Sequence, residues 1–188
     1  MWPWEHLAFG YLAYSVWSHV WDRRSPTGPA VLVLAVATQL PDLVDKPLGW
    51  SLDVVSTGYS VAHSVLVAGP LVLGAVLVSH RRGRPALGGA LAIGWASHLV
   101  GDIVYPVLFG RGISVGKVLW PVVSLPASDG EFAFSDRVVY YFVRYLREAA
   151  EPGQAMLLVF PLTLLLAVFA LWGYDGWPGL GTLRRMVT

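Results

Sequence analysis

The chain has 188 residues, a length that suits one domain, and 55% of them are hydrophobic while only 13% are charged. Because an average soluble domain has about 25% charged residues, this composition predicts an integral membrane protein. The net charge of +1 argues against nucleic-acid binding, and the absence of cysteine excludes disulfides, thiolate metal sites and cysteine nucleophiles.

Five apolar stretches are predicted to form membrane-spanning helices, since crossing a bilayer takes about 20 apolar residues. In chain order they cover residues 7–21, 30–44, 61–79, 86–109 and 155–173. The second is interrupted by Gln39, Pro41 and Asp42, so a re-entrant hairpin is the alternative there. The predicted fold class is all-α: a polytopic membrane helix bundle of about five helices, forming one domain over residues 1–188.

A long connection, residues 110–154, separates the fourth and fifth of these helices. Within it, residues 136–151 carry apolar side chains at helical spacing and predict an amphipathic helix. Two interpretations stay open for this helix. It lies in the membrane interface beside a substrate entrance, or it packs on the bundle.

The basic residues indicate an orientation. Clusters of arginine follow the first helix, join the third to the fourth, and end the chain; they are Arg23 and Arg24, Arg81, Arg82 and Arg84, and Arg184 and Arg185. With five crossings these clusters fall on one side, which the positive-inside rule makes cytoplasmic. The N-terminus, which lacks the basic residues of a signal peptide, is then expected to be retained and to face outward across the cell (inner) membrane.

On that topology, acids and histidines from four helices gather at the outer face. They are His6 at the start of the first helix, Asp42 and Asp45 at the end of the second, His63 at the start of the third, and His98 and Asp102 in the fourth. His98 and Asp102 are four residues apart, and Asp42 and Asp45 are three apart, so each pair shares a helix face. His19 and His80 fall on the opposite side and are excluded.

Each feature also has a purely structural interpretation. His98 and Asp102 can form a hydrogen bond that locks helices together, and Lys46 can neutralise the Asp42–Asp45 pair. Jointly, however, the residues favour a metal site. A carboxylate at mid-bilayer costs about 2.5–3.5 kcal/mol, and a divalent cation would offset the repulsion among three of them. Mixed His/Asp ligation suits zinc, with manganese or iron as alternatives, as one or two ions. Asp45 is the candidate bridging ligand or general base.

Four segments in this order resemble the YdjM family, membrane-bound proteins described as LexA-regulated, metal-dependent hydrolases. The segments are His6-Leu7-Ala8-Phe9-Gly10, Leu40-Pro41-Asp42-Leu43-Val44-Asp45, Ala62-His63-Ser64 and Ser97-His98-Leu99-Val100-Gly101-Asp102. The resemblance covers residues 5–105 and implies a metal site with His6, Asp42, His63, His98 and Asp102 as ligands. Asp45 matches the second acid of the family's Pro-Asp-x-x-Asp pattern.

The chain departs from the family at one point. Members often carry an arginine shortly before the Thr/Ala-His-Ser element, where this chain reads Gly58-Tyr59-Ser60-Val61. If that arginine binds phosphate, Lys46 or Arg111 must replace it here. The family is distantly similar to zinc-dependent phospholipase C enzymes, and this implies a phosphoester substrate.

The sequence therefore predicts a membrane-embedded metal-dependent hydrolase, acting on a phospholipid or lipid-linked phosphate through metal-activated water. The expected partners are membrane lipids and such a substrate, with no nucleic acid. The alternative is a non-catalytic membrane protein that binds or transports a metal with the same cluster. The apolar inner halves of the third and fourth helices argue against a transport path, and the chain lacks the Gly-x-Ser-x-Gly elbow of serine hydrolases.

Overall fold

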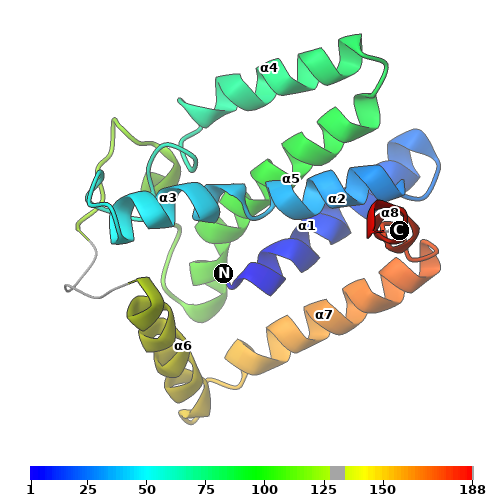
Figure 1. The fold of residues 1–188 in the computed structure, drawn as a ribbon. Coiled ribbons are helices and arrows are strands. Elements are labelled where there is room, and N and C mark those ends of the chain that lie inside the picture. The colour runs from blue at the N-terminus through cyan, green and yellow to red at the C-terminus, as the bar shows by residue number, and fades with distance from the viewer. Residues whose placement is uncertain (128–133, 188) are drawn as a thin grey trace.

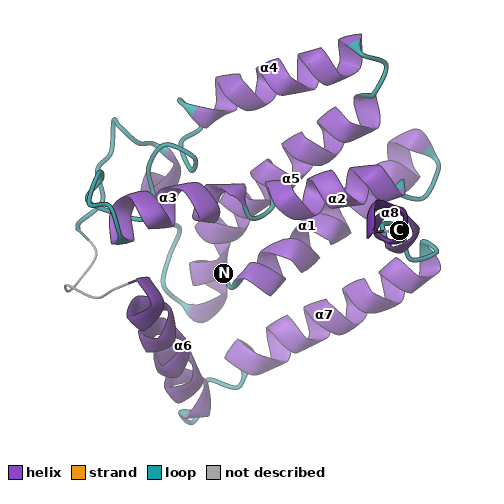
Figure 2. Cartoon of the chain, in the orientation of Figure 1, coloured by secondary structure: helices purple, strands orange, loops and turns teal. Residues whose placement is uncertain are grey.

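The computed structural model describes residues 1–127 and 134–187, and every regular element in these ranges is a helix (Figure 2). The prediction of an all-α fold is therefore confirmed for the described part of the chain. The elements are α1 (Pro3–Trp17), the π-helical turn η1 (Ser18–Asp22), α2 (Gly28–Ala37), α3 (Leu40–Trp50), α4 (Ala68–Arg81), α5 (Pro85–Val104), the 3-10 helices η2 (Tyr105–Phe109) and η3 (Val115–Val118), α6 (Phe134–Ala150), α7 (Met156–Tyr174) and α8 (Leu180–Val187).

Three helical stretches of the described chain are long and apolar enough to cross a bilayer: Gly28–Trp50, Pro85–Val107 and Met156–Tyr174. The count of about five crossings is not confirmed. The third predicted helix begins at Ala68 instead of residue 61, because residues 61–67 form turns, and α4 has only 14 residues. The amphipathic helix predicted over residues 136–151 is confirmed as α6.

The second predicted span is a broken helix. α2 ends at Ala37 and α3 begins at Leu40, and the two lie end to end, so the chain continues onward and does not turn back as a hairpin (Figure 1). Pro41 lies in the first turn of α3, where its missing N–H and fixed φ are tolerated. Because the last carbonyls of a helix lack partners within it, the break leaves the Thr38 carbonyl available to another element.

α5 lies at the centre of the bundle and packs against α1, α2 and α4 (Figure 1). Its contact with α2 is made by small residues: Ala90 on α5 and Ala30 and Ala37 on α2 are completely buried. A Cβ atom added at Gly94 would lie 2.8 Å from the Ala37 Cβ and 3.0 Å from the Leu34 carbonyl oxygen. Close approach through small residues is the usual way that helices pack in membranes.

The two ends of the bundle differ in character. The arginine-bearing α1–α2 and α4–α5 connections and α8 lie at the end opposite to α3 and α6 (Figure 1). Near that end Asp175 accepts hydrogen bonds from Tyr11 Oη and Ser15 Oγ, both at 2.7 Å, and contacts His19 Nε2 at 2.6 Å. This network joins the end of α7 to α1 and η1, and it gives His19 a structural partner away from the acids and histidines of α3 and α5.

The close α2–α5 contact yields a stability prediction. Gly94→Leu should lower the thermal unfolding midpoint of the detergent-purified protein, because a larger side chain overpacks the contact, at a cost of about 1–3 kcal/mol. Gly89→Leu is the matched control, since an added Cβ there meets no atom within 4 Å. Equal midpoints for the two variants, measured by thermal denaturation, would contradict this packing.

Candidate metal centre

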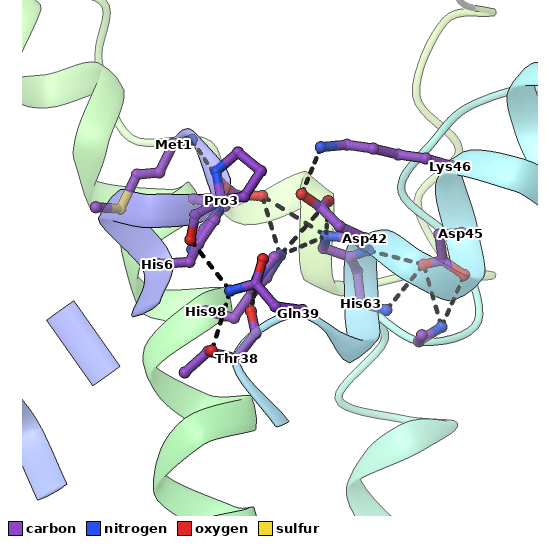
Figure 3. A network of polar contacts seen from close by, with 12 residues as sticks. Met1, Pro3, His6, Thr38, Gln39, Asp42, Asp45, Lys46, His63 and His98 are labelled. Carbon is purple, nitrogen blue, oxygen red and sulfur yellow. Dashed lines mark hydrogen bonds and ion pairs between the residues drawn. The ribbon is translucent and has the colours of Figure 1, made fainter. Parts of the chain in front are cut away.

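Four side chains converge where α3, α5 and the α3–α4 connection meet (Figure 3). They are Asp42 on α3, His63 in the connection, and His98 and Asp102 on α5, and one ligand atom from each lies within 4.8 Å of all the others. His63 and His98 are completely buried, Asp102 is 2% exposed, and Asp42 at 9% is the most accessible. The structure thus brings together four of the six residues that were predicted to form the site.

The histidine nitrogens lie 3.1–3.7 Å from each other and from the two carboxylates. His63 Nε2 lies 3.6 Å from both Asp42 Oδ1 and Asp102 Oδ2. His98 Nε2 lies 3.6 Å and 3.7 Å from the same two oxygens, and 3.1 Å from His63 Nε2. Ligands about 2.0–2.1 Å from a zinc ion are separated by about 3.3–3.4 Å in tetrahedral geometry and about 2.8–3.0 Å when they are at right angles. The separations fit a donor set around one cation.

The tautomers of both histidines are set by their outer nitrogens. His98 Nδ1 lies 2.7 Å from the Thr38 carbonyl oxygen, which can only accept, so this nitrogen carries the hydrogen. His63 Nδ1 donates to Asp45 Oδ2 at 2.8 Å. When both rings are neutral, each Nε2 directs a lone pair into the cluster, and the two nitrogens lie 3.1 Å apart. A cation satisfies that arrangement, and outer hydrogen bonds of this kind orient metal-binding histidines in proteins.

Asp45 is not brought into the cluster. Its completely buried carboxylate accepts hydrogen bonds from the backbone N–H groups of Ser60 at 2.8 Å, Ala62 at 3.0 Å and His63 at 2.9 Å, besides the His63 ring. Asp42 and Asp45 lie almost one helical turn apart on α3. Asp42 therefore reaches the cluster, whereas Asp45 binds the loop that carries His63. This loop also replaces the helical start that was predicted for His63.

His6 lies beside the four-residue cluster. Its ring stacks on His98, with centroids 3.7 Å apart and planes 12° apart, and its Nε2 lies 3.3 Å from Asp102 Oδ1. That contact is too poorly directed to count as a hydrogen bond, and neither ring nitrogen of this buried histidine has a hydrogen-bond partner. The Met1 amino nitrogen lies 3.0 Å from the same Asp102 oxygen.

Of the two cations predicted to bind substrate, the structure brings only Lys46 to the site. Its Nζ forms an ion pair with Asp42 Oδ2 at the edge of the cluster. Arg111 is exposed and pairs with Glu148 on α6 at 2.7 Å. Hydrogen bonds from Arg144 and Arg111 lower the pKa of the Glu148 carboxyl.

A lysine that the sequence did not single out takes the place expected for Arg111. Lys117, in η3, donates to the Asp102 carbonyl oxygen at 3.2 Å and lies 4.7 Å above the centre of the Tyr59 ring. No local pattern marks this residue, because the contact depends on how the segment after α5 folds back over the end of that helix. The excluded histidines lie elsewhere: His80 is exposed at the end of α4, and His19 contacts Asp175.

Comparison with known proteins identifies the family. A sequence profile described as "YdjM inner membrane protein" matches residues 1–175. No curated protein and no solved structure matches the chain. The match includes all four segments that resembled the family, together with the whole of the His/Asp cluster. The chain therefore belongs to the YdjM family of inner membrane proteins.

Proposed function

We propose that this protein is a membrane-embedded, metal-dependent phosphoester hydrolase. The observation that carries the proposal is the convergence of four buried donor atoms, with the Nδ1 atoms of His63 and His98 already bonded outward. Two imidazoles and two carboxylates form a donor set that zinc prefers, and that manganese and iron also accept. The membrane location rests on the family and on the three apolar helical stretches.

The residues that would hold the ion are Asp42, His63, His98 and Asp102, and the cluster has room for one ion among them. A divalent ion bound there would lower the pKa of a coordinated water toward about 7 and polarise a phosphoryl oxygen. Hydrolysis of a phosphoester consumes one water molecule, breaks the P–O ester bond and releases an alcohol and a phosphate. His6, stacked on His98 with two unpartnered ring nitrogens, is the nearest additional donor.

The surrounding residues would keep the donors in place. Asp45 fixes the ring of His63 and the loop that bears it, so we assign it an orienting role in place of ligation or general-base catalysis. The Thr38 carbonyl does the same for His98. Lys46, paired with Asp42 at the accessible edge of the cluster, supplies positive charge for an anionic substrate.

We also propose that the cluster faces the outer side of the inner membrane. The arginine-rich connections lie at the bundle end opposite to the cluster (Figure 1). If the positive-inside rule places those arginines in the cytoplasm, the cluster faces the outer side of the inner membrane, at the depth of lipid headgroups.

Metal analysis tests the site. Wild-type protein purified in detergent and dialysed against zinc should retain about one equivalent by mass spectrometry, whereas His98→Ala and Asp42→Ala should retain almost none, because each removes a ligand. His80→Ala is the matched control, since His80 is exposed in the last turn of α4 and lies outside the cluster. Retention of zinc by both ligand variants would contradict the site.

The orienting role of Asp45 predicts an intermediate effect. Asp45→Asn should weaken zinc binding by about 10- to 100-fold, as expected for the loss of a carboxylate that positions a metal-binding histidine, while one equivalent still binds at saturating zinc. Asp53→Asn, at an exposed position on the same connection, should bind zinc like the wild type. Competition with a chelating dye measures both affinities. Unchanged affinity in Asp45→Asn would show that the hydrogen bonds to His63 are dispensable.

Catalysis is tested on the same samples. Zinc-loaded protein should hydrolyse p-nitrophenyl phosphate or its diester, and treatment with EDTA or the His98→Ala substitution should abolish the release of p-nitrophenol. Stoichiometric zinc without hydrolysis of any phosphoester in a panel that includes phospholipids would rule out the hydrolase and leave a metal-binding membrane protein.

A further inference from the structure

A pocket of about 540 Å³ adjoins the His/Asp cluster. It is bounded by the start of α1, by α3, by the loop residues Gly58 and Tyr59, and by α6, and it meets the cluster at Asp42 and Lys46. Its size is that of pockets that enclose small organic ligands. Whatever occupies the pocket therefore reaches the most accessible of the four candidate ligands.

Five aromatic residues are part of the pocket lining: Trp2, Trp50, Tyr59, Phe134 and Tyr141. Trp50 on α3 contacts Phe134 and Tyr141 on α6, with ring centroids 5.8 Å and 5.9 Å apart. Trp2, which lines the pocket at the start of α1, contacts Phe142 of the same helix at 5.3 Å. These contacts hold the amphipathic helix α6 over the pocket. An aromatic wall of this kind offers a large apolar surface on which a hydrocarbon chain can be buried.

Two lysines lie beside the cluster. The chain contains only two lysines, Lys46 and Lys117, against eleven arginines, and both lysines lie at the site. The Tyr59 ring lies between Lys117 and His63: its face meets the ammonium at 4.7 Å and its ring contacts His63 at 4.8 Å. Within the described residues, no carboxylate oxygen lies within 4.0 Å of Lys117 Nζ, whose hydrogen-bond partner is a backbone carbonyl.

The charges of the site complement a phosphate group. With one divalent ion bound, the carboxylates of Asp42 and Asp102 would be balanced, and the ammonium groups of Lys46, Lys117 and Met1 would give the site a net positive charge. Lysine binds phosphate as a point charge, and two lysines flanking a metal suit a phosphomonoester with two negative charges. The same site joins a phosphate-binding end directly to a hydrocarbon-binding end.

We propose that the substrate is an amphiphilic phosphate ester, whose phosphate lies between Lys46 and Lys117 and whose hydrocarbon chain occupies the aromatic pocket under α6. This inference rests on the proposed function, since it identifies the substrate class of the same centre. It assigns Lys117 to phosphate binding and Tyr141 to chain binding.

The test compares two probes, inorganic phosphate and dodecyl phosphate, with zinc-loaded protein in phosphatidylcholine nanodiscs. Binding is measured by isothermal titration calorimetry, and zinc content is checked for every variant. The wild type should bind dodecyl phosphate at least tenfold more tightly than inorganic phosphate, because only the former fills the pocket. Lys117→Met should weaken both probes by about tenfold, since it removes a charged hydrogen-bond donor.

The pocket variant separates the two ends of the site. Tyr141→Ala should weaken dodecyl phosphate by about fivefold and leave inorganic phosphate unchanged, because it removes only contacts to the chain. The controls are Arg147→Met, an exposed cation on α6, and Tyr174→Ala, an exposed tyrosine at the end of α7. Both controls should bind the two probes like the wild type. Because every variant is measured in the same lipid, comparison with the controls removes the contribution of dodecyl phosphate that partitions into the nanodisc.

The outcomes distinguish this inference from the proposed function. If zinc is bound and p-nitrophenyl phosphate is hydrolysed, but dodecyl phosphate binds no better than inorganic phosphate or is unaffected by Tyr141→Ala, the amphiphilic substrate is wrong and the hydrolase stands. If Lys117→Met binds both probes like the wild type, Lys117 does not bind phosphate. Loss of zinc binding in the wild type itself would instead remove the proposed function.

Discussion

The site depends on two imidazole nitrogens that face each other at 3.1 Å inside an apolar bundle. A hydrogen bond from Nδ1 fixes the orientation of each ring. His63 is bonded to the Asp45 carboxylate and His98 to the Thr38 carbonyl oxygen. At that distance a proton on one nitrogen can bridge the pair, and a cation bound to both lone pairs can take its place. Two carboxylates at 3.6–3.7 Å complete the donor set, and each also pairs with an ammonium group, Asp42 with Lys46 and Asp102 with the Met1 amino group.

The fold supplies this arrangement from irregular elements as much as from helices. The break between α2 and α3 provides the Thr38 carbonyl, and the turns before α4 wrap His63 around the Asp45 carboxylate. α5 contributes His98 and Asp102 on one face, and its small residues let α2 approach closely enough for Thr38 to reach His98. α6 then covers the adjoining pocket, so an amphipathic surface helix becomes part of the site.

The sequence predicted those elements and candidate ligands that follow from helical periodicity. The i,i+4 spacing of His98 and Asp102 and the apolar stripe of α6 are local patterns, and both agree with the structure. The turns before α4 were not predicted, because hydrophobicity alone does not distinguish a turn from a helix within the apolar run of residues 61–79. The partner of Asp45 and the approach of Lys117 were also beyond prediction, since both depend on contacts between loops and helices distant in sequence.

X-ray absorption spectroscopy of the zinc-loaded protein tests the central claim most directly, because it reports the atoms bound to the metal. We expect one zinc ion with about four nitrogen and oxygen ligands at about 2.0–2.1 Å. The spectrum should also contain the outer-shell scattering of two imidazole rings. A spectrum without imidazole scattering, or a protein that binds no stoichiometric zinc, would contradict it.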